Sequence, residues 1–260
     1  MDEVKIEGPE WPKDKEILLD DFALRSFCDI ADQDYIAARL AYRSHLTTQF
    51  LWLGLQAVEK YLKCILLLNR IKGTDIGHHL ELAYDRINER EPFRISLSKV
   101  SLKIMRHLDT YGKNRYFEFP FYVEGLDLIR LDRLIWEIRR YCFLPAEKTA
   151  TSGSSQRRTE GQQKEFEDRR REIKSKQPVN GLLGEILANR EHPARAALIW
   201  ENACFGNRWR PKVRSGYTTL HNSPLSLCPE LLEDVQKYVY LPGVVKEACK
   251  KKMRNEDGKD

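Results

Sequence analysis

The sequence predicts an all-α protein whose first part is a helical bundle. The segment 47–69 is apolar around nearly its whole circumference, which is typical of the central helix of a bundle. Apolar residues recur every three or four positions in the segments 21–46, 96–110 and 123–142. No long stretch alternates apolar and polar residues as a half-buried strand does. The first 145 residues therefore predict helices packed on one central helix.

Each predicted helix is based on its own pattern. In segment 21–46, steps of three and four residues place one set of side chains on a single face: Leu24, Cys28, Ala31, Tyr35, Ala38 and Tyr42. Segment 47–69 carries two apolar stripes, Leu51, Leu55, Val58, Leu62 and Ile65 beside Gly54, Ala57, Tyr61, Cys64 and Leu68. Within it, Glu59 and Lys63 form an i to i+4 pair in the favourable order.

Shorter signals predict where the remaining helices of the bundle begin and end. A short helix is expected over 79–88, after a loop with two glycines. The helix over 96–110 is expected to end at Gly112, because glycine tolerates the left-handed conformation that follows many helices. The helix over 123–142 is closed by Pro145.

Composition divides the chain into five parts. Residues 1–20 are expected to form an arm, 21–145 the bundle, 146–163 a linker, 164–250 a basic helical region that includes a helix beginning near Pro229, and 251–260 a frayed tail. Residues 1–150 carry 23 Lys and Arg against 24 Asp and Glu, a net charge of −1, whereas the rest carries 21 against 15, a net of +6. The basic excess of the second part permits a polyanionic partner.

Several classes of protein and site are not signalled by the sequence. No apolar run is long enough to span a membrane, and the N-terminus lacks the pattern of a secretory signal. The six cysteines show no Cys-x-x-Cys spacing, so we expect reduced thiols in the cytoplasm, no metal site and no cofactor. Phosphate-binding loops and zinc-protease motifs are also lacking.

A basic segment of the second part, residues 207–214, has the composition of a nucleic-acid contact. Four cations alternate with Trp209 and two other residues, and an extended chain would place the cations on one face: Arg208, Arg210, Lys212 and Arg214. Grooves for single-stranded nucleic acid combine cations for phosphates with rings for base stacking. The alternative is a surface loop that Trp209 anchors to the bundle.

The stretch "QAVEKYLKCILLLNR", followed by "HHLEL", resembles the HEPN family (higher eukaryotes and prokaryotes nucleotide-binding domain). The matching positions are Gln56, Ala57, Glu59, Lys60, Tyr61, Lys63, His79 and Leu80. The resemblance covers about residues 21–143. It implies a four- or five-helix bundle that forms a homodimer and handles RNA or nucleotides, often in defence or toxin–antitoxin settings. A nucleotidyltransferase-like or other defence protein is an expected partner.

The ribonucleases of that family carry an arginine followed after four to six residues by a histidine, and they cut RNA without a metal. The matching arginine is Arg115, but the positions expected for histidine hold Pro120, Phe121 and Tyr122. The pairs Arg39–His45 and Arg214–His221 show similar spacing elsewhere, and we interpret both as chance. If the protein is catalytic, Arg115 supplies charge, and Glu118 or Tyr122 must transfer the proton.

Three functions therefore remain open. The leading hypothesis is a homodimer that binds RNA or a nucleotide at a dimer cleft lined by Asn114, Arg115 and Tyr116, with further contacts from His78, Lys60, Lys63 and the basic segment. The second is a metal-independent endoribonuclease with a non-standard acid–base group. The third is a non-catalytic partner or scaffold for another protein. Arg115 and the two lysines also have an interpretation without a ligand. Arg115 would pair with Glu118, and Lys60 and Lys63 would form a solvated stripe on an otherwise buried helix.

Overall fold

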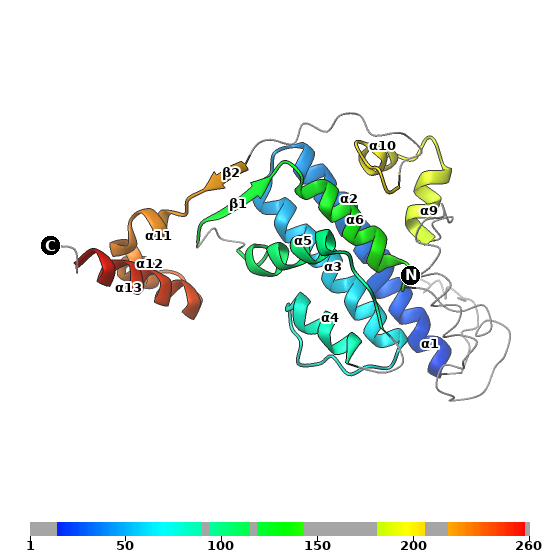
Figure 1. Ribbon diagram of the computed structural model, residues 1–260, viewed down its shortest axis with the longest axis horizontal. Helices are drawn as coiled ribbons and strands as arrows, with labels where there is room; N and C mark the ends of the chain where they lie inside the picture. The colour runs from blue at the N-terminus through cyan, green and yellow to red at the C-terminus, as the bar shows by residue number, and fades with distance from the viewer. Residues whose placement is uncertain (1–14, 90–93, 115–118, 143–180, 206–217, 258–260) are drawn as a thin grey trace, which may run out of the picture.

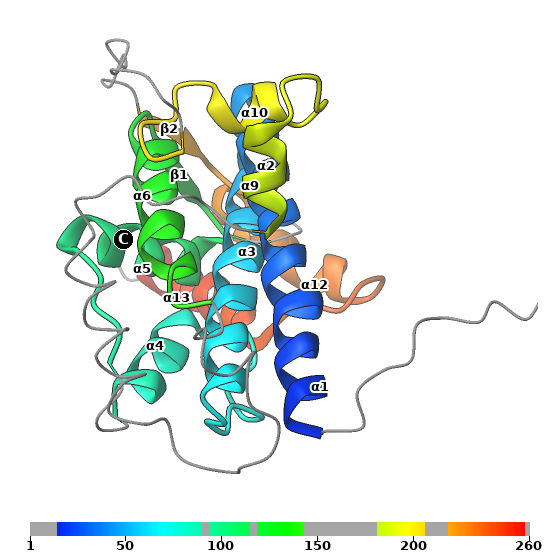
Figure 2. The same cartoon turned by 90° about the vertical axis from the view of Figure 1, so that its right-hand side faces the viewer.

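The computed structural model describes residues 15–89, 94–114, 119–142, 181–205 and 218–257, and these are mostly helical. Their order begins with α1 (Lys15–Phe22), η1 (Ala23–Cys28), α2 (Asp29–Arg43), α3 (Thr47–Leu68), α4 (Leu80–Asn88) and α5 (Lys99–Tyr111). After the short strand β1 (Phe121–Glu124) comes α6 (Asp127–Arg139), and Figures 1 and 2 show these helices gathered around α3. The predicted all-α class is confirmed.

The central helix α3 is explained by its two apolar stripes. Its side chains at Leu55, Ala57, Val58, Leu62 and Ile65 are completely buried. Helix α2 packs along α3, and both contribute to one hydrophobic core that also includes α4, α5 and α6. The predicted boundaries, 47–69, agree with the observed helix to within one residue.

The first long helix contains a π-helical segment that its sequence pattern did not predict. Helix α1 begins at Lys15, inside the predicted arm, and continues through η1 into α2. In η1 the amide of Asp29 donates to the carbonyl oxygen of Leu24, five residues earlier. This wider turn makes Ala23 and Cys28 the buried residues, while Leu24, predicted on the inner face, is partly buried and packs against the core.

Two segments near the predicted loop 111–122 differ from expectation. The predicted helix 123–142 begins only at Asp127, because Phe121–Glu124 pair antiparallel with β2 (Thr218–His221). Gly112 does follow α5, but its φ of −65° is not left-handed. A Cβ there would lie 2.7 Å from the Leu55 Cβ, so glycine is explained by the close approach of α5 to α3.

The second part of the chain divides between two hydrophobic clusters. Helices α9 (Gly181–Ala188) and α10 (Arg195–Ile199) bury Leu183, Ile186, Ala197 and Leu198 in the core of the bundle. Buried polar side chains hold this segment: Arg39 Nε donates to the Ala197 carbonyl oxygen at 2.9 Å, and Arg39 also contacts the carbonyl of Trp200. Residues 181–205 therefore complete the bundle.

Residues 224–257 form a smaller cluster, here named the C-terminal unit. It consists of α11 (Pro224–Leu227), η3 (Pro229–Leu231), α12 (Leu232–Gln236) and α13 (Gly243–Asp257). Its core contains Leu225, Leu232, Leu241, Val245 and Cys249. Figure 1 shows the unit beyond the β1–β2 pair, at the opposite end from α1. The predicted helix near Pro229 is interrupted after Gln236, and much of the predicted tail belongs to α13.

A search of the described ranges finds no helix with the length and apolar character that crossing a membrane requires.

Candidate functional site

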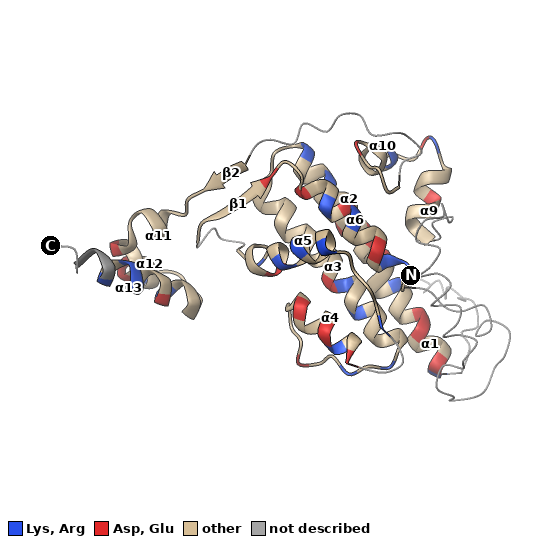
Figure 3. Cartoon of the chain, in the orientation of Figure 1, with Lys and Arg blue, Asp and Glu red and all other residues tan. Residues whose placement is uncertain are grey.

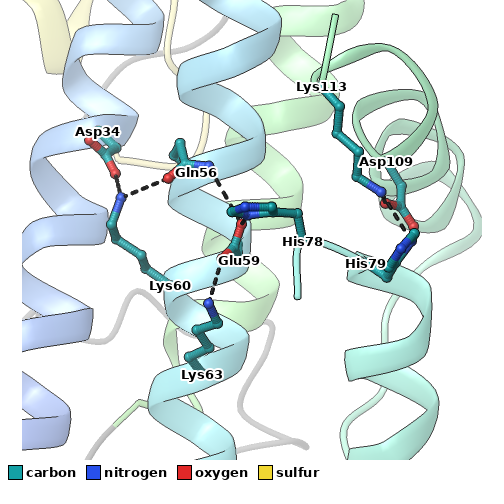
Figure 4. Close-up of polar contacts among 9 residues, drawn as sticks. All are labelled: Asp34, Gln56, Glu59, Lys60, Lys63, His78, His79, Asp109 and Lys113. Carbon is teal, nitrogen blue, oxygen red and sulfur yellow. Dashed lines mark hydrogen bonds and ion pairs between the residues drawn. The ribbon is translucent and has the colours of Figure 1, made fainter. Parts of the chain in front are cut away.

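Three of the described candidate residues, Lys60, Lys63 and His78, lie in a row of polar side chains on the bundle (Figure 4). We call it the polar row; it consists of Asp34, Gln56, Glu59, Lys60, Lys63, His78, His79, Asp109 and Lys113. Its members come from α2, from α3, from the loop before α4, and from the end of α5 and the residues after it. The row therefore brings together residues up to 79 positions apart, from Asp34 to Lys113.

The centre of the polar row is Glu59, whose side chain is only 7% exposed. Gln56, Glu59, Lys60 and Lys63 are spaced at i, i+3, i+4 and i+7, so they share one face of the otherwise apolar α3. Glu59 accepts hydrogen bonds from Lys63 Nζ at 2.6 Å and contacts His78 Nδ1 at 2.7 Å. A nearly buried carboxylate thus fixes a lysine and a histidine that both reach the surface.

The two lysines of α3 are ion-paired and partly exposed. Lys60 pairs with Asp34 and donates to Gln56 Oε1 at 3.3 Å, and its side chain is 23% exposed. Lys63 is 33% exposed and pairs with Glu59, as the sequence predicted. Their charges are therefore held in fixed positions, and each keeps some contact with solvent. A ligand role for either lysine stays a prediction.

The two histidines of the loop before α4 point to different parts of the row. His78 is 51% exposed, and its ring lies edge-on to Trp52 with centroids 6.5 Å apart. His79 Nδ1 lies 3.0 Å from Lys113 Nζ, which in turn pairs with Asp109 at 2.8 Å. Lys113 was not among the predicted site residues, and its position links the row to the segment that carries Arg115.

Asn114 has a structural role that the sequence did not indicate. It is 2% exposed, and its Nδ2 donates to the Phe119 carbonyl oxygen at 2.6 Å. The Phe119 amide donates back to Asn114 Oδ1 at 3.4 Å. One side chain thus ties the two ends of segment 115–118 together. The predicted contact of Asn114 with a ligand stays a prediction.

Several predicted site residues lie outside the described ranges. These are Arg115, Tyr116 and Glu118 near the end of α5, and Arg208, Trp209, Arg210, Lys212 and Arg214 in the basic segment. Arg39, whose spacing to His45 we interpreted as chance, is described and has a side chain 0% exposed that pairs with Asp132.

The structure identifies one histidine that sequence reasoning missed, His107 of α5. Its Nε2 is buried without a hydrogen-bond partner among the described residues and lies 3.8 Å from Asp127 Oδ2. The ring packs against Tyr111 and Tyr122, with centroids 4.9 and 4.8 Å away. Burial lowers the pKa of His107, while Asp127 opposes this shift, so the neutral imidazole is favoured. His107 follows the inward-facing Ile104 by three residues, and this spacing could have predicted that His107 also faces inward.

The surroundings of Tyr122 make it a poor proton acceptor. Burial is the largest cause that raises its pKa, followed by the neighbouring Tyr111 and carboxylates. A raised pKa keeps the phenol protonated, so Tyr122 is better suited to donate a hydrogen bond than to remove a proton.

In the described ranges, no group of three or more His, Cys, Asp or Glu side chains is placed to hold a metal ion. The polar row can offer hydrogen bonds to a ligand, and each of its three lysines is paired with a carboxylate. Comparisons of the chain with protein-family models, with curated proteins and with solved structures find no match, so a functional assignment depends on the residues themselves.

Proposed function

We propose that the protein is a homodimer that binds RNA or a nucleotide beside the polar row, in a cytoplasmic defence or toxin–antitoxin setting. The observation that carries the proposal is the position of Lys113 and Asn114. Lys113 belongs to a row with two other lysines and two histidines, and Asn114 donates to the Phe119 carbonyl oxygen, which joins the two described residues on either side of positions 115–118. Lysine and arginine side chains are suited to phosphate, and Arg115 follows Lys113 by two positions in the sequence.

The carboxylates of the row do not contradict this function. Glu59 and Asp34 are each bonded to a lysine, so they orient cations. Lys63 and His78 remain 33% and 51% exposed, which leaves part of each side chain available to a ligand. Two copies of such a row facing each other across a dimer would double the number of lysine and histidine side chains available to one RNA strand.

The test is binding of a fluorescently labelled single-stranded RNA at several salt concentrations. We expect Arg115→Ala to weaken binding and to reduce the slope of log affinity against log salt by about 0.7, the value for one lost phosphate contact on a single strand. The matched control is Arg25→Ala, since Arg25 is a 60% exposed arginine on η1, within the first long helix. Wild-type binding that does not depend on salt, or equal losses in both variants, would contradict the proposal.

A metal-independent ribonuclease remains the second candidate, because His107 is an imidazole near Tyr122, whereas positions 120–122 hold no histidine. Its neutral ring contacts Tyr122, one of the predicted catalytic residues. Incubating labelled RNA with the protein in EDTA tests this function. Cleavage by the wild type that is lost in both Arg115→Ala and His107→Gln would favour catalysis, and intact RNA would exclude it for that substrate.

A further inference from the structure

The C-terminal unit exposes two aromatic rings that are two positions apart in the sequence. Tyr238 is 86% exposed and Tyr240 is 85% exposed, the highest values among the exposed large hydrophobic residues in the described ranges. They lie between α12 and α13, and Lys246 Nζ lies 5.7 Å from the centre of the Tyr240 ring. An exposed ring beside a cation is a suitable surface for stacking a nucleobase.

The helix that follows is basic on its exposed side. Residues 243–254 contain five Lys and Arg and one acidic residue, Glu247. Lys246, Lys250 and Arg254 are spaced four residues apart, which places them about 6 Å apart along one side of the helix. Lys250, Lys251 and Arg254 are exposed, whereas Val245 and Cys249 are buried in the core of the unit. The cations therefore point away from that core.

We propose that the C-terminal unit binds single-stranded RNA, with Tyr238 and Tyr240 stacking on unpaired bases and Lys246, Lys250, Lys251 and Arg254 contacting phosphates. Val239 and Val244 are also exposed beside the rings, at 55% and 73%, so a membrane surface is the competing ligand that the experiment separates from RNA. Duplex RNA is a poorer fit, since paired bases do not expose their faces to the rings.

The unit is attached next to the proposed site of the bundle. Phe119 packs against the core of the C-terminal unit, and Asn114 bonds both the amide and the carbonyl of Phe119. The unit is thus anchored at the end of segment 115–118, which carries Arg115. Arg115 lies between Asn114 and Phe119 in the sequence, so this inference deepens the proposed RNA binding and depends on it.

The experiment measures the affinity of the full-length protein for a labelled single-stranded oligouridine. We expect Tyr238→Ser with Tyr240→Ser to weaken binding by about tenfold per ring. We expect Lys250→Glu with Lys251→Glu to weaken it and to lower the salt slope by about 0.7 for each lost phosphate contact. The controls on the bundle are Phe22→Ser, at a 52% exposed ring, and Lys15→Glu with Arg25→Glu, which makes the same charge change. Circular dichroism and urea midpoints confirm that each variant is folded.

The outcomes separate this inference from the function on which it rests. If Arg115→Ala weakens binding but the tyrosine and lysine variants bind like the controls, the inference is overturned and the proposed function stands. If the wild type does not bind the oligouridine, both fail. If polyglutamate displaces the labelled oligouridine as well as unlabelled oligouridine does, the rings contribute nothing to binding, and the base-stacking role is overturned. Binding to phosphatidylserine vesicles that is lost in these variants, with RNA affinity unchanged, would assign the surface to lipid instead.

Discussion

Replacing Arg39 with methionine should destabilise the protein more than most single substitutions. The guanidinium is 0% exposed and pairs with Asp132, whose side chain is 2% exposed. It also donates to the Ala197 carbonyl oxygen and contacts the carbonyl of Trp200. Methionine fills similar space but leaves Asp132 as an unpaired buried charge.

The magnitude follows from these contacts. Removing one partner of a buried ion pair costs about 3–5 kcal/mol, and each carbonyl left without a donor adds about 1–3 kcal/mol if it stays buried. Because the α10 segment can shift and expose these carbonyls to water, we expect a total near the lower sum, about 4–5 kcal/mol. Burial is the main cause of the raised pKa of Asp132, and loss of Arg39 would raise this pKa further.

Urea unfolding followed by far-UV circular dichroism measures the loss. The control is Arg39→Met combined with Asp132→Leu, which removes both charges. We expect it to recover about half of the lost stability or more, since an apolar replacement of a buried pair is often neutral. A single variant that loses less than about 1 kcal/mol, or a double variant no more stable than the single one, would refute the reasoning.

Three further predictions concern the bundle. Gly112→Ala should lower the unfolding free energy in urea by about 2–3 kcal/mol, since its new Cβ would meet Leu55. Gly54→Ala should lower it less, because its new Cβ would lie 3.1 Å from a flexible Leu108 methyl. Equal losses in the two variants would contradict the close-approach argument. Because burial lowers the pKa of His107, the unfolding free energy should fall as pH drops below about 6.5. His107→Phe should remove this part of the decline. If the wild type and the variant lose stability in parallel as pH falls, His107 does not cause the decline. Ser98→Ala should cost about 1 kcal/mol, because Ser98 caps α5 by accepting the Ser101 amide, and an unchanged urea midpoint would exclude that role.

The parts of the fold that sequence predicted are those governed by local periodicity. Helix α3 was located to within one residue because its two apolar stripes are continuous over 22 residues. Strand β1 was missed because its partner, β2, lies almost 100 residues later, and pairing at that distance leaves no local pattern. The end of α13, residues 251–257, was taken for a tail because the helix has few buried residues, among them Val245 and Cys249, and many lysines.

The candidate site was predictable to a similar extent. The pairing of Lys63 with Glu59 follows from spacing within one helix, and it is confirmed. The bonds from Asn114 to Phe119 depend on a loop conformation, and the contact of His107 with Tyr122 joins two elements. Neither type of contact is encoded in residue spacing, so neither was foreseen.

The π-helical turn at Ala23–Cys28 has a consequence for how the gene for this protein can change. An in-frame loss of one codon within that turn would leave a regular α-helix, with better backbone hydrogen bonds than the present one. The five residues of the i to i+5 turn would become the four of an i to i+4 turn, so α1 would keep nearly its present orientation on α2. Asp20, 2.8 Å from Arg70 Nη1, would therefore keep its partner. The first long helix can lose a residue at this position at less cost than in its regular α-helical parts.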